Sequence, residues 1–575
     1  MRIFKYLKRY WVYAILAPLF MVGEVAMDLI QPYLMRDIVD VYLPNGEVLE
    51  VVKTGGIMLA LVLFGGICGI LCGVFTNKAA FGYSNDLRQD VFKHIVNLSF
   101  EQTDNFTTGS LVTRITNDIT QVTNIVSMSM RMLIRTFMQF AMGSIMLIGI
   151  NKEFSIILFI ILPILLIMMI IFLIKLNPLF AKIQTRVDDV NAVVQENVTG
   201  ARVVKAYTAE NKEINRFKKA NDNLFNINWK VAKIFSSMGP FMSICINSAL
   251  IAILYIGGRN IVNNAGADLK VGDLTAAITF ITIILMGFMM LAMFFQMIVR
   301  GIASIRRLNE VLNTTPAVVE GNLETTEEVG TVEFKNVNFI YPGSSGENVL
   351  SNINLKVNKG EKIGILGSTG CGKSTLVNLV TRFYDVTDGE VLVDNVNVKD
   401  FKFSSLRNKV ALVLQKSELY SGTIKENICW GKEDATMEEV EYAAKIAQAD
   451  SFIKSFNEGY ETFVAEKGAS LSGGQKQRIS IARALIKKPE ILIFDDSTSA
   501  LDLQTEANLY KAINENLKDM TIITIAQRVA SVKNADKIVV LNDGEIASIG
   551  THDELMQNSS IYQDIYNSQL KKDGE

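Results

Sequence analysis

Residues 367–375 read Gly367-Ser368-Thr369-Gly370-Cys371-Gly372-Lys373-Ser374-Thr375, which matches the phosphate-binding pattern G-x-x-x-x-G-K-[ST]. The preceding residues 362–366 form a short apolar run typical of a buried strand, and residues 376–380 open a predicted helix. Glycines let the main chain approach phosphate oxygens, and a helix N-terminus adds a positive partial charge. The pattern therefore predicts a nucleotide site in which Lys373 holds the β- and γ-phosphates and Ser374 is a Mg²⁺ ligand.

The composition indicates a membrane protein with a second, globular part. The 575 residues are 49% hydrophobic, and their mean hydropathy of +0.25 is higher than that of ordinary soluble proteins. The apolar excess lies in roughly the first 300 residues, while the remainder has the mixed polarity of an α/β domain. The net charge of −2 comes with no single basic face, so nucleic acid is not an expected partner. The five cysteines follow neither a disulfide framework nor metal-ligand spacing.

Apolar runs predict a transmembrane domain over residues 13–304. Residues 1–12 mix basic and aromatic side chains, which predicts an interfacial elbow helix on the membrane surface. The following run, 13–35, is too long for the core of a signal peptide, so it is predicted to be a retained span. Further spans of about 20 residues are predicted near 55–77, 129–150, 154–174, 234–258 and 274–298, which makes six helices.

Two long connections, near 78–128 and 175–233, carry more Lys and Arg than the short ones. The positive-inside rule places them, and both chain termini, in the cytosol. Both contain helical stretches, 86–98 and 187–207, so we expect them to extend the spans as cytosolic stalks. Flexible loops are the alternative.

Charged residues lie within the predicted spans. Glu24 and Asp28 are one helical turn apart in the first span. Two roles are open for them: they attract cationic substrates or line a gate, or they form a structural pair with Arg131 or Arg135 of the third span.

The sixth span contains flexible thioether and aromatic side chains, among them Met286, Met290 and Phe294. They suit an apolar substrate cavity, and helix packing or lipid contact explains them nearly as well. Spans with few fixed polar groups favour amphipathic drugs or lipids as substrates over sugars or ions.

A linker over residues 305–330 is predicted from Pro316 and a run of acidic residues, so the nucleotide-binding domain is expected to span 331–575. Its first predicted strand, 332–339, is followed by Tyr341, which precedes a proline. The Tyr341 ring is predicted to stack on the adenine base, with packing at the strand end as the alternative.

Three further motifs complete the predicted site. Gln415 ends a predicted strand, and its amide can reach both the Mg²⁺ shell and a mobile loop. Another predicted strand, 491–494, delivers Asp495, which would bind Mg²⁺ through water. A second phosphate-binding helix start is Leu471-Ser472-Gly473-Gly474-Gln475. Because one nucleotide does not need two such helix starts, we expect the second to cover a nucleotide held by another subunit, in a head-to-tail pair.

Together with the stretch Ser499-Ala500-Leu501-Asp502, these motifs resemble the ATP-binding-cassette (ABC) transporters. Six spans fused to one such domain resemble the half-transporters of the exporter branch. The resemblance implies a membrane α-helical six-span exporter domain, a cytosolic α/β P-loop domain, and the use of ATP with Mg²⁺. Residues 104–109 and 202–207 are similar to the intracellular loops of that branch, which implies short coupling helices that dock on the nucleotide domains, one of them on the partner subunit.

Two positions depart from the family pattern. Asp496 stands where the family usually has Glu. Its side chain is one methylene shorter, so the carboxylate expected to polarise the attacking water lies about 1.5 Å closer to the main chain than that of Glu. Gln527 stands where the family has a switch-loop His; its amide can bond a γ-phosphate but never carries an imidazolium charge. The two histidines of the chain, His94 and His552, fall in a predicted stalk and in the C-terminal tail.

The signature 471–475 is intact, as is Glu466, which resembles the cross-talk residue of the family. This combination resembles the degenerate-site subunit of heterodimeric bacterial multidrug exporters. The resemblance implies a heterodimer in the cell membrane that exports amphipathic small molecules, with slow hydrolysis at this chain's phosphate loop and fast hydrolysis at the partner's. A homodimeric drug or lipid exporter with Asp496 as a slow catalytic carboxylate, and a nucleotide-gated regulatory subunit, stay open as alternatives.

Overall fold

The computed structural model describes residues 2–263, 269–327, 329–344, 346 and 348–573. The chain divides into two compact units. One, the helical unit, comprises Met1–Val96 and Thr108–Asn313, and the other, the α/β unit, comprises Asn97–Thr107 and Thr314–Glu575. A short segment of the first long predicted connection, 97–107, therefore packs with the α/β unit.

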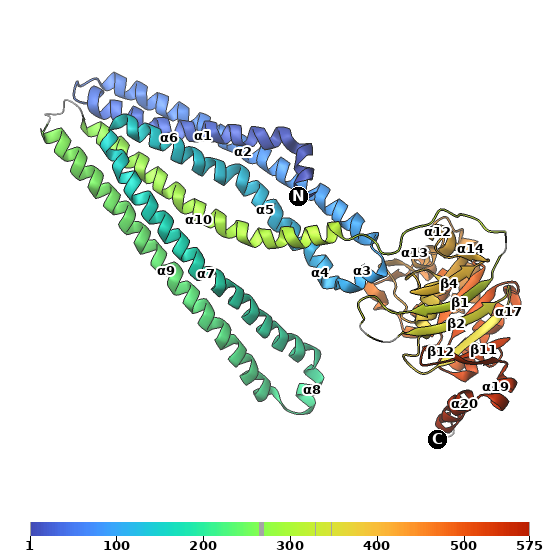
Figure 1. The fold of residues 1–575 in the computed structure, drawn as a ribbon. Helices are drawn as coiled ribbons and strands as arrows, with labels where there is room; N and C mark the ends of the chain where they lie inside the picture. Colours follow the sequence, from blue (N-terminus) through green and yellow to red (C-terminus); the bar gives the residue numbers. More distant parts are fainter. Residues whose placement is uncertain (1, 264–268, 328, 345, 347, 574–575) are drawn as a thin grey trace. The chain divides into compact units, whose positions relative to one another are not determined.

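Long apolar helices make up the helical unit (Figure 1). Within the described residues, six helical stretches are long and apolar enough to cross a membrane, which confirms the six predicted spans. Three helices, of 49, 48 and 54 residues, are far longer than the roughly 20 residues that a bilayer requires, and they continue through the regions where stalks were predicted. The elements are η1 Arg2–Tyr10, α1 Trp11–Asp37, η2 Ile38–Tyr42, α2 Val48–Val96, α4 Thr108–Thr113, η3 Arg114–Asp118, α5 Ile119–Met128, η4 Ser129–Leu133, α6 Ile134–Ile150, α7 Lys152–Thr199, α8 Ala201–Ala206, α9 Glu210–Asn263 and α10 Val271–Asn313.

The last helix of this unit, α10, is longer than the sequence indicated. It runs to Asn313, so residues 305–313, predicted to begin the linker, are helical. Pro316 lies beyond the helix end, and a Pro shortly after a helix C-terminus is a common stop. The non-helical connection thus begins at Thr314, where the second and longer segment of the α/β unit also begins.

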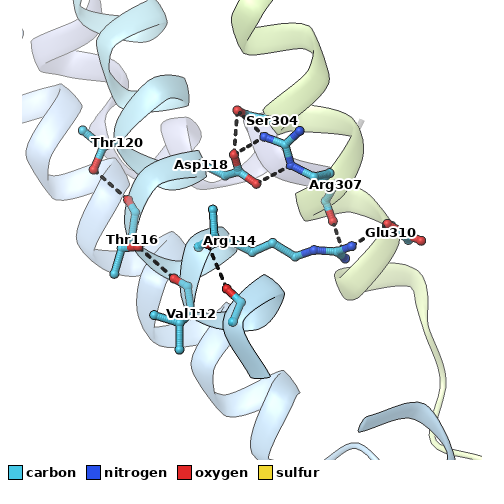
Figure 2. Close-up of polar contacts among 10 residues, drawn as sticks. Val112, Arg114, Thr116, Asp118, Thr120, Ser304, Arg307 and Glu310 are labelled. Carbon is cyan, nitrogen blue, oxygen red and sulfur yellow. Dashed lines mark hydrogen bonds and ion pairs between the residues drawn. The ribbon is translucent and has the colours of Figure 1, made fainter. Parts of the chain in front are cut away.

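A buried charge network joins the C-terminal part of α10 to η3 (Figure 2). Asp118, only 2% exposed, accepts hydrogen bonds from Ser304 Oγ and Arg307 Nε, both at 2.8 Å. Arg114, also buried, donates to the Arg307 carbonyl at 3.1 Å and to Glu310 at 2.9 Å. Each buried charge therefore has an opposite charge beside it, and removing one partner would leave a costly unpaired ion. The network explains why α10 stays helical past the predicted boundary.

The described residues of the α/β unit contain three sheets. A mostly parallel six-stranded sheet has the order β12-β11-β3-β10-β9-β6, an antiparallel four-stranded sheet has the order β2-β1-β4-β5, and β7 pairs with β8. The strands are β1 Val332–Phe339, β2 Leu350–Val357, β3 Lys362–Gly367, β4 Asp388–Val393, β5 Val396–Asn397, β6 Val410–Val413, β7 Gly422–Thr423, β8 Phe463–Val464, β9 Ile491–Asp495, β10 Thr521–Ile525, β11 Lys537–Asn542 and β12 Glu545–Gly550.

Helices cover these sheets and carry the loops of the predicted site. They are α3 Phe100–Asn105, α11 Lys373–Val380, α12 Phe403–Lys409, α13 Ile424–Cys429, α14 Met437–Ile446, α15 Asp450–Lys454, η5 Gly459–Glu461, η6 Glu466–Gly468, α16 Gly473–Leu485, α17 Leu503–Asn516, α18 Val529–Val532, α19 His552–Asn558 and α20 Ser560–Asp573.

The parallel sheet explains how distant motifs meet. Strands β9 and β10 are buried along their whole length and lie between β3 and β6, as expected for a sheet covered on both faces. Parallel strands bring their carboxyl ends to one edge, where ligands bind in open α/β sheets. The phosphate loop follows β3, Gln415 follows β6, the paired aspartates end β9, and Gln527 follows β10.

Candidate nucleotide-binding site

The phosphate loop runs from the end of β3 into α11. Gly370 and Gly372 have φ angles of +90° and +97°, in the left-handed region that favours glycine. A Cβ at Gly372 would also lie 2.7 Å from a methyl carbon of Leu350, so a larger residue does not fit there. Lys373 Nζ donates to the carbonyls of Gly367 at 2.8 Å and Ser368 at 2.7 Å. The ammonium group and the start of α11 thus share one loop, the arrangement that binds phosphate.

A hydroxyl and a carboxylate suited to Mg²⁺ lie together at the end of this loop. Ser374 Oγ donates to Asp495 Oδ1 at 2.8 Å, which brings together two of the three predicted Mg²⁺ groups. Burial raises the pKa of Asp495, and the neighbouring Asp496 carboxylate acts in the same direction, while the Ser374 bond opposes them. Both oxygens are of the hard type that Mg²⁺ prefers, so the residues fit the ion.

The third predicted Mg²⁺ group, Gln415, bonds the other aspartate instead. Gln415 Nε2 donates to Asp496 Oδ2 at 3.1 Å, and Gln527 Nε2 donates to the same oxygen at 2.8 Å. Asp496 is 8% exposed and has a φ of +46°, an uncommon conformation for a residue other than glycine. Two amides, from the ends of β6 and β10, therefore donate to one oxygen of the carboxylate that follows β9.

Tyr341 lies beside the phosphate loop, as its predicted contact with the base requires. Its hydroxyl is 3.0 Å from Thr375 Oγ1 in α11, and its ring packs edge-on against Phe339 and Tyr384, with centroids 4.9 Å and 5.3 Å away. This packing fixes the ring next to the nucleotide loop, and its stacking on adenine stays a prediction.

The sequence did not reveal that Tyr384, which packs against Tyr341, also contacts α3. Tyr384 OH donates to Asp104 Oδ2 at 2.5 Å, and Phe100 packs on Phe383 with centroids 4.5 Å apart. Burial raises the pKa of Tyr384, and Asp104 raises it further. The only signal in the sequence was a pair of adjacent aromatic residues after a predicted helix, which does not indicate what they contact. The segment predicted as a coupling helix is therefore held by the residues that follow α11.

The signature motif forms the start of α16. Ser472 is the N-cap: its Oγ accepts from Gln475 N at 3.4 Å, and Gln475 Oε1 accepts from Ser472 N at 2.9 Å, a capping box. Leu471 is buried in the core, while Ser472 and Gly473 are exposed. A Cβ at Gly474 would lie 3.2 Å from the Ala500 carbonyl, so the signature packs closely on the predicted Ser499–Asp502 loop.

In the spans, the structure favours the pairing of charges. Arg135 donates to Glu24 Oε1 at 3.0 Å and to Asp28 Oδ2 at 3.3 Å, while Arg131 is exposed. A Cβ at Gly69 would lie 2.9 Å from Glu24 Oε2, so α2 also packs closely on this carboxylate. These contacts match the structural alternative for Glu24 and Asp28, with Arg135 as the partner.

The three predicted cavity residues of α10 differ in exposure. Met286 and Met290 are exposed by 56% and 43%, whereas Phe294 is only 3% exposed. Phe294 thus packs among helices of this chain, and the two methionines present apolar surface. A substrate role for these three residues stays a prediction.

Comparisons with known proteins agree with this architecture. The family models for the ABC transporter transmembrane region and the ABC transporter match residues 14–289 and 350–499. The uncharacterized ABC transporter ATP-binding protein YfiB of Bacillus subtilis is 37% identical over 569 residues, which cover 99% of this chain and 98% of that protein. The ATP-dependent lipid A-core flippase of Desulfotalea psychrophila is 33% identical over 558 residues, covering 96% and 95%.

Two further relatives support the export class. The putative multidrug export ATP-binding/permease protein YgaD of Bacillus subtilis is 35% identical over 491 residues, which cover 84% of this chain and 83% of that protein. A solved structure of a bacterial Atm1-family ABC exporter with ATP bound is 25% identical, with a TM-score of 0.82 and 98% of each chain covered.

Six spans followed by a P-loop α/β unit define an ABC exporter chain with a membrane domain and an ATP-binding domain. The chain belongs to the ABC transporter family. It is therefore a membrane protein whose ATP-binding domain supports ATP hydrolysis coupled to transport, and this confirms the predicted fold class.

Proposed function

We propose that this chain is one half of a heterodimeric exporter of amphipathic small molecules, and that its own nucleotide site binds ATP but hydrolyses it slowly. The observation that carries this proposal is the hydrogen bonding of Asp496, whose Oδ2 accepts hydrogen bonds from both Gln415 and Gln527. A general base must offer an oxygen lone pair to the proton of the attacking water. Here two amide N–H donors compete with that proton for one oxygen.

Side-chain length and charge act in the same direction. An Asp carboxylate stands about 1.5 Å further back than a Glu carboxylate on the same main chain, which is more than catalytic geometry tolerates. The Gln527 amide can bond a γ-phosphate without ever carrying positive charge. Both replacements leave nucleotide contacts in place and weaken the chemistry.

The groups needed for binding are retained. Lys373 lies within the phosphate loop, Ser374 and Asp495 are paired as a Mg²⁺ site requires, and Tyr341 lies against the first turn of α11. Mg²⁺ held between Ser374 and Asp495 would neutralise phosphate charge. The site is thus built to hold ATP, and holding it can favour one state of the transporter.

The signature of this chain is proposed to complete a fast site on the partner. Its first residues are exposed at the start of a capped helix, where N–H groups can meet a phosphate. A partner that retains Glu and His at the positions of Asp496 and Gln527 would supply the catalytic groups. The resulting pair has one slow site and one fast site.

Surfaces on both units suit a second subunit. The structure describes all six residues of α8, and each of them is at least partly exposed. The exposed fraction of Val203 is 61%. In the α/β unit, a groove of about 590 Å³ is lined by Leu414 and by the stacked rings of Tyr420 and Trp430, whose centroids are 4.1 Å apart. We propose that this groove receives the coupling helix of the partner, as the resemblance implied.

The transport cycle follows from these roles. ATP bound at both sites joins the two nucleotide domains, the long helices convert this closure into opening of the spans, and hydrolysis at the partner's site resets the pair. Relatives named as a lipid A-core flippase and a putative multidrug exporter, together with the apolar spans, support an amphipathic substrate.

The test is to purify the chain alone and together with a candidate partner, beginning with the product of an adjacent reading frame. The proposal predicts negligible ATPase activity from the chain alone and robust activity from the pair, which is abolished when the partner's catalytic Glu is replaced by Gln. Robust activity from the chain alone would instead establish the homodimeric alternative.

A further inference from the structure

The C-terminal helix α20 contacts the switch loop through one side chain, that of Gln569. Its Nε2 donates to the main-chain carbonyl of Gln527 at 2.7 Å, and its Oε1 accepts from the main-chain N–H of Val529 at 2.9 Å. One amide thus bridges the two ends of the Gln527–Val529 segment. Because Val529 begins α18, the same contact satisfies an N–H that has no partner within that helix.

Arg528, the N-cap of α18, makes no side-chain capping bond, so Gln569 supplies the cap from a different element. A helix of four residues has little stability of its own, and its position depends on tertiary contacts. The amide of Gln569 therefore helps to decide where the switch loop ends and α18 begins.

Helix α20 packs into an apolar cluster next to the nucleotide site. Tyr562 is fully buried in a cluster with Leu366, Val529 and Val532, and Leu366 is the residue directly before the phosphate loop. The Tyr562 hydroxyl lies 2.7 Å from His552 Nδ1, and burial raises the pKa of Tyr562 to about 12, so it stays a neutral hydroxyl. The helix that carries Gln569 thus contacts α18, which packs on the strand before the phosphate loop, and all three contribute to one apolar cluster.

Gln527 is consequently held at two points. Its side-chain amide donates to Asp496 Oδ2 at 2.8 Å, and its main-chain carbonyl is held by Gln569. A side chain that is to contact a γ-phosphate must be placed within a fraction of an ångström. Neighbouring side chains that do not touch the ligand themselves commonly fix such positions.

We propose that Gln569 is a positioning residue that sets the switch loop for recognition of the γ-phosphate at this chain's own nucleotide site. It touches no nucleotide; it acts through Gln527. The inference rests on the proposed function, in which Gln527 bonds the γ-phosphate. It adds that the C-terminal helix determines how strongly this site prefers ATP to ADP.

The experiment measures the affinities of AMP-PNP and ADP at this chain's site, in the full-length transporter assembled with its partner, whose own phosphate-loop Lys is replaced. Gln569→Met preserves side-chain length and removes both bonds. We expect it to weaken AMP-PNP binding about three- to tenfold, the size of one or two hydrogen bonds, and to leave ADP binding unchanged. Gln569→Glu keeps the acceptor for Val529 N–H and loses the bond to Gln527, so it should lower the preference for AMP-PNP as well.

A matched control lies on the same helix. Gln563 donates to the Met556 carbonyl at 2.7 Å and does not bond the switch loop, so Gln563→Met should leave both affinities unchanged. A double-mutant cycle then tests whether Gln569 acts through Gln527: on a Gln527→Ala background, Gln569→Met should produce no further loss.

The outcomes separate this inference from the function on which it rests. Equal losses for AMP-PNP and ADP, or additive losses in the cycle, would show that Gln569 only stabilises the fold. If Gln527→Ala abolishes the preference and Gln569→Met retains it, the positioning role alone is wrong. If Gln527→Ala has no effect, the γ-phosphate contact of the proposed function is wrong, and the positioning role with it.

Discussion

Gln527 donates a 2.8 Å hydrogen bond from its amide to Oδ2 of Asp496, so the two positions at which this chain departs from the ABC transporter pattern are direct neighbours. Groups in contact do not contribute independently to stability or catalysis. A longer carboxylate without a switch-loop His would still meet an amide donor, and a His without the longer carboxylate would lack its catalytic partner. The two replacements are therefore expected to act as one unit.

The first prediction concerns restoring that unit. Asp496→Glu combined with Gln527→His should raise ATP turnover at this chain's site at least about tenfold, since a positioned general base contributes 10²–10⁴-fold. Turnover is measured in the assembled pair after the partner's catalytic Glu is replaced by Gln, so that this site alone contributes. Each single variant should give a much smaller gain. Unchanged turnover in the double variant would place the block in the partner's signature.

The second prediction concerns the signature at the start of α16. Ser472→Ala removes a capping hydroxyl and the group proposed to face the partner's ATP, so it should lower the ATPase activity of the pair about tenfold or more while nucleotide affinity at Lys373 stays unchanged. Thr436 caps α14 with the same type of capping box, which makes Thr436→Ala the matched control. Equal losses of activity from the two variants would show that helix capping alone is responsible.

The third prediction concerns the contact between Tyr384 and Asp104. Tyr384→Phe keeps the ring against Tyr341 and removes only the bond to α3, so nucleotide affinity should be retained while substrate stimulation of the ATPase falls about threefold or more. Tyr442, exposed on α14, provides the control Tyr442→Phe. Loss of nucleotide affinity together with stimulation would mean that Tyr384 only supports the base pocket.

The fourth prediction decides between the two roles of Glu24 and Asp28. Arg135→Gln leaves both carboxylates without their bonded cation in an apolar span, so the midpoint of thermal unfolding should fall by several degrees, and substrate range should not change. The exposed Arg131 offers the control Arg131→Gln, which should have little effect. Unchanged stability together with tighter binding of cationic substrates would support the substrate role instead.

The sequence predicted that the phosphate loop, Gln415 and Asp495 meet because each follows a predicted apolar strand, and parallel strands bring their carboxyl ends to one edge. It did not predict that Gln415 and Gln527 bond the same oxygen of Asp496, because that depends on side-chain directions across three strands. The sequence did not predict the contact of Gln569 for a similar reason. This residue lies on a helix after the last strand, and only tertiary packing brings it to the switch loop.

The boundary of α10 shows the same limit. Acidic residues and Pro316 indicated a linker from residue 305, yet the helix continues to Asn313. One of the stabilising contacts, between Asp118 and Arg307, joins residues 189 positions apart in the sequence. Local patterns contain no information about such a pair.

The central claim, that ATP is held on this chain and cleaved on its partner, is tested most directly by trapping the pair during turnover. Photoreactive ATP labelled on the γ-phosphate, or in parallel on the α-phosphate, is cross-linked and the two subunits are separated. The account predicts that this chain retains the γ-label, while the partner carries mainly the α-label, as ADP. Faster loss of the γ-label from the subunit that contains Lys373 would contradict it.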